Sequence, residues 1–105
     1  MDEQQQIARA IFEDAATTSS AVNFSGFRSF ALEVPSGDHA TAVTVQTLSG
    51  DGSTWIDVLA ITDTTNRVKG LTVLEQLAFE PLRQIRLKVG SGVSGQKTYY
   101  LHMIS

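Results

Sequence analysis

The most constraining feature of this sequence is a turn-forming segment between two runs of apolar and β-branched residues. Residues 49–54 read SGDGST; TAVTVQTL (41–48) precedes them and WIDVLAI (55–61) follows. Glycine reaches positive φ without a steric penalty, and β-branched residues favour extended backbone, so the pattern predicts a β-hairpin. A hairpin with such flanks indicates an antiparallel β architecture.

Several other segments alternate between apolar and polar residues, the period expected of half-buried strands. The clearest are residues 28–34, 84–89 and 98–104. Together with the hairpin they predict seven or eight short strands in an all-β fold, an antiparallel β-sandwich or a jelly-roll-like single domain. The side chains expected to fill its core are Phe30, Leu32, Val43, Val45, Trp55, Ile85, Leu87 and Leu101.

The first residues have no clear strand period, so the chain divides into an N-terminal arm or edge segment (1–16) and a β-sandwich domain (17–105). Ile7, Ile11 and Phe12 would be unfavourable to leave in water. One interpretation is an arm that packs on a neighbouring subunit, which makes these three residues candidates for a partner interface. The other is a first edge strand over residues 11–15 of the same domain.

Composition excludes several classes of function. The chain has no cysteine, so it contains neither a disulfide nor a thiolate metal site. Its net charge is −3 and no run of Lys and Arg stands out, so binding to nucleic acid is not expected. No apolar run approaches the ~20 residues of a membrane helix, and the start is acidic rather than signal-like. We therefore expect a soluble protein that is made in a cytoplasm and does not enter the membrane.

Residues with catalytic potential do not form a recognisable constellation. Ser36, Asp38 and His39 are near neighbours in one polar turn, whereas a catalytic triad needs groups that converge in space. His39 and His102 lack the spacing of a zinc site. We therefore expect no enzymatic activity, no metal and no cofactor.

A few residues offer ligand contacts. Asp51 and Ser53 lie in the hairpin turn and Tyr100 lies on the last strand, so these three are candidates for contacts with a ligand. Trp55 has an aromatic face that suits sugar stacking, but its position at the base of the hairpin favours a place in the core.

Two patterns resemble known proteins. Residues 50–55 (GDGSTW), followed by residues 83–87 (RQIRL), resemble a pattern of discoidin-like β-sandwiches that short phage virion proteins share. Residues 17–32, residues 86–92 (RLKVGSG), Gln96 and the alternating C-terminal strand are together similar to small phage and prophage proteins often encoded near capsid genes.

The resemblance implies a virion structural protein, most simply a capsid decoration (cement) protein on the outer surface of the head shell. It also implies that the partner is the major capsid protein or another virion protein, and that the chain forms a homo-oligomer, with a trimer as the expected state. The alternatives are a discoidin-like carbohydrate-binding module and a structural component of the tail or head–tail junction.

Overall fold

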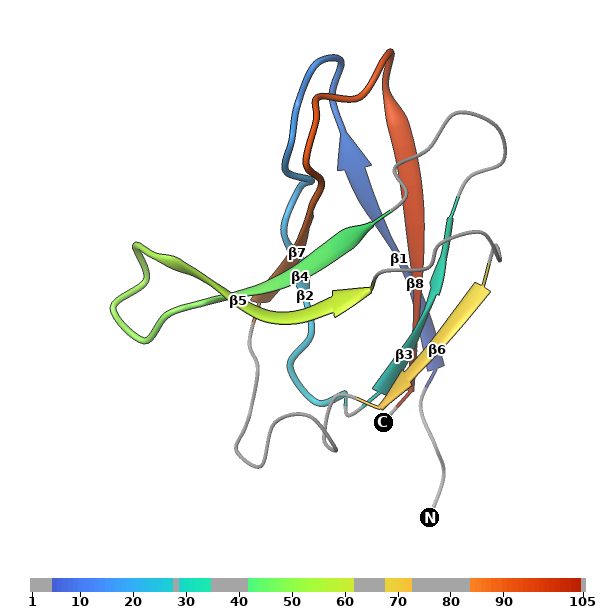
Figure 1. The fold of residues 1–105 in the computed structure, drawn as a ribbon. Helices are drawn as coiled ribbons and strands as arrows, with labels where there is room; N and C mark the ends of the chain where they lie inside the picture. Colours follow the sequence, from blue (N-terminus) through green and yellow to red (C-terminus); the bar gives the residue numbers. More distant parts are fainter. Residues whose placement is uncertain (1–4, 28, 35–41, 62–67, 73–83, 105) are drawn as a thin grey trace.

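The computed structural model describes residues 5–27, 29–34, 42–61, 68–72 and 84–104. This part of the chain contains eight strands and no helix, and the strands form two four-stranded antiparallel sheets in one domain (Figure 1). The first sheet has the order β1-β8-β3-β6 and the second has the order β2-β7-β4-β5. The strands are β1 Gln5–Phe12, β2 Val22–Asn23, β3 Ser29–Glu33, β4 Val43–Leu48, β5 Trp55–Ile61, β6 Val68–Thr72, β7 Gln84–Lys88 and β8 Lys97–Ile104. The predicted all-β fold class is confirmed.

The strand pairing has a simple rule. β1 pairs with β8, β2 with β7, β3 with β6 and β4 with β5, so the two numbers of each pair add up to nine. A chain paired in this way is one long antiparallel ribbon, closed at the β4–β5 hairpin, whose successive pairs are assigned alternately to the two sheets. This is the arrangement of a jelly roll. The hairpin that the sequence predicts is therefore the closed end of the whole ribbon.

The β4–β5 hairpin projects from the body of the domain (Figure 1). Its turn is held by hydrogen bonds from the Ser49 amide to the Thr54 carbonyl (2.7 Å) and from the Gly52 amide to the Ser49 carbonyl (2.9 Å). Gly52 has a φ of 77°, a conformation that glycine adopts at little cost. The glycine-containing turn predicted for residues 49–54 is therefore present in the structure.

The core lies between the two sheets. It consists largely of the inward-facing residues of the strands, which are every second residue along most of them. Of the side chains predicted for it, seven are buried, namely Phe30, Leu32, Val43, Val45, Ile85, Leu87 and Leu101. Aromatic packing adds to the core, because the rings of Phe24 and Phe30 meet edge to face with their centroids 5.8 Å apart. Each fully buried aliphatic or aromatic side chain contributes about 1.5–3 kcal/mol relative to exposure.

Trp55 is not part of this core, so its predicted place was wrong. It is only partly buried and pairs with Leu48 in the β4–β5 ladder. The register of that ladder shifts between Val45 and Gln46, so Gln46 faces Asp57 while Val45 faces Leu59. A bulge of this kind breaks the period of two. Simple alternation along β5 therefore fails to place Trp55, which lies on the outer face.

The N-terminal residues form β1, an edge strand that pairs with β8 from Gln5↔Ile104 to Phe12↔Lys97. Phe12 is fully buried, and its ring centroid lies 5.2 Å from that of Tyr99. The prediction that Phe12 contacts a partner is therefore wrong, because its side chain is already enclosed by its own domain. Residues four apart share a face in a strand as they do in a helix, so the spacing of Ile7 and Ile11 does not by itself distinguish the two.

Candidate functional site

The outer face of the second sheet carries a cluster of polar and aromatic side chains from three neighbouring strands. Gln46 on β4 lies at its centre, opposite Asp57 of β5 on one side and Arg86 of β7 on the other. Trp55, at the start of β5, completes the group. We call these four residues the Trp55–Arg86 cluster.

The four side chains form one continuous network. The Arg86 Nε donates a hydrogen bond to Gln46 Oε1 (2.7 Å), and Gln46 Nε2 donates one to Asp57 Oδ1 (2.7 Å). The Arg86 Cζ lies 4.4 Å from the centroid of the Trp55 ring, within the range of a cation–π contact. Gln46 is only 5% exposed, so the network satisfies an amide that would otherwise be buried without partners.

Partial burial lowers the pKa of Arg86, although the group stays cationic at neutral pH because a guanidinium titrates far above it. The hydrogen bond from Arg86 to Gln46 uses the Nε of Arg86, so it leaves the two terminal guanidinium nitrogens to other partners. Tryptophan and arginine are the residues that most often dominate protein–protein interfaces. The cluster is therefore suited to contact another protein through a fixed, pre-ordered surface.

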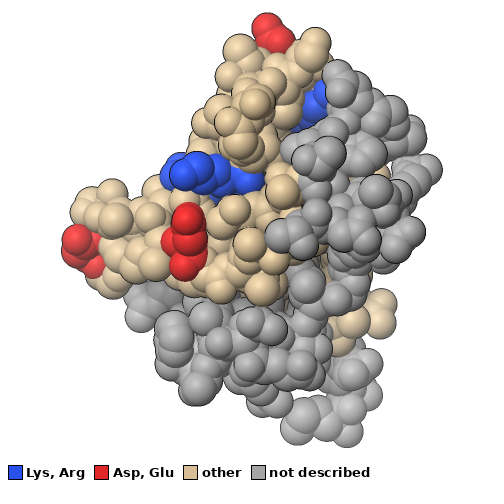
Figure 2. Space-filling model, in the orientation of Figure 1, with Lys and Arg blue, Asp and Glu red and all other residues tan. Residues whose placement is uncertain are grey.

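The surface around the projecting hairpin is sparsely charged. Figure 2 shows a basic group beside an acidic group at the base of the hairpin and a further acidic group at its tip. The charged residues of the described strands in this sheet are Asp57 on β5 and Arg86 and Lys88 on β7. Ile56 is 46% exposed on the same hairpin, so an apolar side chain accompanies the charges.

The ligand contacts predicted from sequence do not form one site. Asp51 and Ser53 lie in the β4–β5 turn, whereas Tyr100 is on β8 in the other sheet. Asp51 is engaged inside the turn, because its Oδ1 accepts hydrogen bonds from the Ser49 hydroxyl and from the Ser53 amide (2.9 Å). The hydrogen bond from Ser49, and then that from the Ser53 amide, lower the pKa of this carboxyl below its usual 3.8. Asp51 thus has a structural role in the turn.

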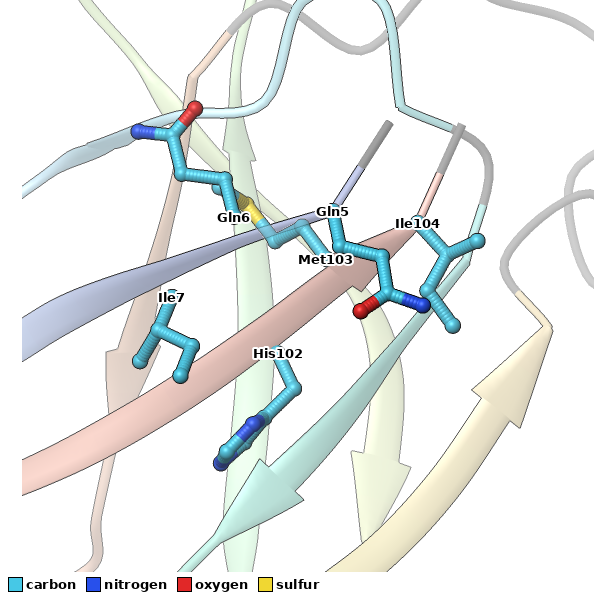
Figure 3. A pocket seen from close by; sticks show the side chains of 6 residues that line it. All are labelled: Gln5, Gln6, Ile7, His102, Met103 and Ile104. Carbon is cyan, nitrogen blue, oxygen red and sulfur yellow. The ribbon is translucent and has the colours of Figure 1, made fainter. Parts of the chain in front are cut away.

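The outer face of the first sheet is the second exposed region. Ile7 is 61% exposed there, Ile11 is partly exposed, and His102 Nε2 lies 2.7 Å from Glu33 Oε1. Figure 3 shows the side chains of Ile7 and His102 on one face of the β1–β8 pair and those of Gln6 and Met103 on the other. A hollow of about 120 Å³ at this end of the pair is lined by Gln5, Gln6, Ile7, His102, Met103 and Ile104. His102 is the one titratable side chain among these six residues, and its partner Glu33 lies outside the lining of the hollow.

Within the described residues, no group of three or more His, Asp or Glu side chains is placed to hold a metal ion. Ser36, Asp38 and His39, considered above for a triad, lie outside the described residues. The described part of the chain also includes no helix that is both long enough and apolar enough to span a lipid bilayer.

The network between Gln46, Asp57 and Arg86 was not predicted from the sequence. Its members are 11 and 40 residues apart, so only the pairing of β4 with both β5 and β7 brings them together. The one available signal was the spacing of Trp55 and Asp57, which share a face of a strand because they are two residues apart.

No protein-family model matches this chain, and no curated protein matches it either. Among solved structures, the fold is similar to that of the SPBc2 prophage-derived protein YomS, with a TM-score of 0.59 and 14% sequence identity over 97% of this chain and 96% of that chain. The structure of the Drosophila NLP core aligns over 97% of this chain and 96% of that chain, with a TM-score of 0.46 and 9% identity. That structure is described as giving insight into pentamer formation and histone binding. The first comparison shows a shared fold, and the second is too distant to support an argument.

Proposed function

We propose that this chain is a phage virion structural protein that decorates the outer surface of the head shell by binding the major capsid protein. The observation that carries the proposal is the fold likeness to a prophage-derived protein over 97% of the chain. Jelly rolls are frequent in viral capsid proteins, which adds support at the level of fold alone. The phage-like patterns in residues 17–32 and 86–92 point the same way.

The contact surface in this proposal is the Trp55–Arg86 cluster with the adjoining β4–β5 hairpin. The cluster is held by its own hydrogen bonds, so little side-chain entropy is lost when a partner binds. The hairpin extends beyond the body of the domain, which allows it to reach a neighbouring subunit of a shell (Figure 1). A modest contact is sufficient, because a shell offers many copies of the same site and linked copies gain avidity.

The carbohydrate-binding alternative receives less support from the same site. Arg86 covers one face of the Trp55 ring, and that face is not open for a sugar to stack on. The discoidin-like interpretation of the hairpin remains a prediction. A tail or head–tail location would use the same surface on a different partner, and the absence of enzymatic activity is part of the proposal.

The test is co-sedimentation of the purified chain with undecorated shells of the major capsid protein encoded with it. We expect saturable binding at a fixed ratio of copies, and a loss of at least tenfold in affinity for Trp55→Ala. Tyr100→Ala is the matched control, because Tyr100 is a partly buried aromatic residue on the other sheet and its replacement should leave shell binding unchanged. If the wild-type chain does not bind shells but binds a glycan on an array, the carbohydrate alternative replaces the proposal.

A further inference from the structure

The edge of β1 that faces away from β8 has a defined hydrogen-bonding direction. The Ile11 amide donates to the Ser20 hydroxyl oxygen (3.0 Å), and the Ile11 carbonyl accepts from the Ser20 amide (2.9 Å). Ile11 therefore points its backbone groups away from β8. Because successive residues of a strand point these groups to alternate sides, those of Arg9, Ile7 and Gln5 point the same way as those of Ile11.

Ser20 pairs with this edge at Ile11. From Gln5 to Arg9, no other described residue pairs with the edge. No described residue is hydrogen-bonded to the outward backbone groups of Gln5, Ile7 or Arg9. The side chains of all three are exposed, and Ile7 reaches 61%. An edge with unpaired amides and carbonyls is a template for another strand, and proteins usually protect it with charges, proline or a bulge. Arg9 is the single charged residue of β1, and its ladder with β8 is regular.

We infer that a second copy of this chain pairs with this edge, β1 against β1 in antiparallel orientation about a twofold axis. Ile7 lies opposite Ile7 of the second copy, and Gln5 lies opposite its Arg9. All of these residues point their backbone groups outward, so each opposed pair exchanges two hydrogen bonds. The two first sheets become one continuous sheet across the dimer.

Charge and steric access select this register. Shifting the axis toward Arg9 by one residue places Gln5 opposite Ile11, and shifting it by two residues brings Arg9 opposite Arg9, which places like charges in direct opposition. Either shift requires the backbone of Ile11, which Ser20 already occupies. Shifting the axis toward Gln5 shortens the paired segment and leaves Ile7 without its counterpart. The register centred on Ile7 avoids all of these losses and buries the most exposed large apolar side chain in the described chain.

A contact of this kind is isologous and closes at two copies. The paired segment is short, so the dimer should form in a concentration-dependent manner rather than permanently. Ile7 lies on the first sheet and the Trp55–Arg86 cluster lies on the second, so self-association and shell binding are separable. The inference therefore does not depend on the proposed function.

Analytical ultracentrifugation of three proteins tests the inference. We expect the wild-type chain to shift from monomer to dimer as its concentration rises. Ile7→Lys and Ile7→Glu should each remain monomeric to at least tenfold higher concentration, because identical charges then face each other across the axis. Mixing the two variants should restore a heterodimer, because Lys and Glu then lie directly opposite.

The matched control is Ile56→Lys, which places the same charge at the other exposed isoleucine and should leave dimerisation unchanged. Circular dichroism and thermal melting establish that each variant is folded, which is expected for exposed positions. A wild-type chain that is monomeric at all concentrations or trimeric overturns the edge pairing. So does an Ile7→Lys variant that still dimerises, and a mixture that stays monomeric overturns the register centred on Ile7.

Discussion

The guanidinium of Arg86 lies over the indole ring of Trp55, with its Cζ 4.4 Å from the ring centroid. The two residues are on β7 and β5, which flank β4 on opposite sides, so the contact spans three strands of the second sheet. Beneath it, the Gln46 side chain is hydrogen-bonded to both flanking strands. The outer face of this sheet is thus tied together by side chains as well as by its backbone ladder.

Replacing Arg86 with Ala should lower the free energy of unfolding by about 1–3 kcal/mol, because the nearly buried Gln46 Oε1 loses its donor. A double-mutant cycle of Arg86→Ala with Trp55→Ala should give a coupling energy of about 0.5–2 kcal/mol for the cation–π contact. Urea denaturation measures each value. Arg9→Ala is the control, since that exposed residue of β1 should change stability by less than about 0.5 kcal/mol. A coupling energy of zero would contradict the stacking.

The fold was largely predictable because its core strands alternate regularly. Residues 30–34, 85–89 and 99–103 bury every second residue, so period alone assigns their inward faces. The turn at residues 49–54 was predictable because its glycines and Asp51 have few other roles. These are properties of local sequence, and they are independent of which strands lie side by side.

The candidate site was not predictable, because it depends on register. Trp55 was placed in the core because of its position at the base of the hairpin, but the bulge between Val45 and Gln46 turns it to the outer face of the sheet. Gln46 could not be recognised as a central residue, because its partners Asp57 and Arg86 come from two other strands. The extent of the first strand, residues 5–12, was also missed, and only an edge strand over residues 11–15 was considered. The alternation of residues 5–12 is carried largely by alanines, which are only weakly hydrophobic.

Phe12 should be far more important for stability than Ile7, although both belong to β1. Phe12→Ala should lower the free energy of unfolding by about 3–5 kcal/mol, because a fully buried ring is removed from contact with Tyr99. Ile7→Ala, measured in the monomer at low concentration, should change it by about 0.5 kcal/mol or less. Chemical denaturation of both variants makes the comparison. Equal and small effects would show instead that residues 5–12 behave as a detachable arm.

Asp51 should make the hairpin turn sensitive to acid. Its pKa is lowered chiefly by the hydrogen bond from Ser49, so its ionised form stabilises the folded state. This contribution is fully present above the unfolded value near 3.8 and is lost as the pH falls through the lower folded value. The stability advantage of the wild type over Asp51→Asn should therefore diminish below pH 3.8. An NMR titration of the Asp51 carboxyl checks the cause directly, because Ser49→Ala should raise its pKa.

Ala15 and Gly92 lie close together where the loop after β1 meets the loop before β8. Ala15 has a φ of 69°, an unfavourable value for a residue with a Cβ, and its amide donates to the Val93 carbonyl (2.8 Å). A Cβ added to Gly92 would lie 2.5 Å from the Ala15 carbonyl oxygen. The obstructing atom belongs to the backbone, so it cannot move aside without displacing the loop.

Gly92→Ala should therefore lower the free energy of unfolding by about 1–3 kcal/mol through overpacking. Gly90→Ala is a matched control, because nothing lies within 4 Å of a Cβ at that position and its backbone needs no positive φ. That variant should be neutral or more stable by about 0.4–1 kcal/mol, since alanine restricts the unfolded chain. Ala15→Gly should be neutral to slightly stabilising, because relief of the strained φ offsets the added freedom of the unfolded state. If thermal denaturation finds Gly92→Ala as stable as Gly90→Ala, the two loops do not pack as closely as the structure indicates.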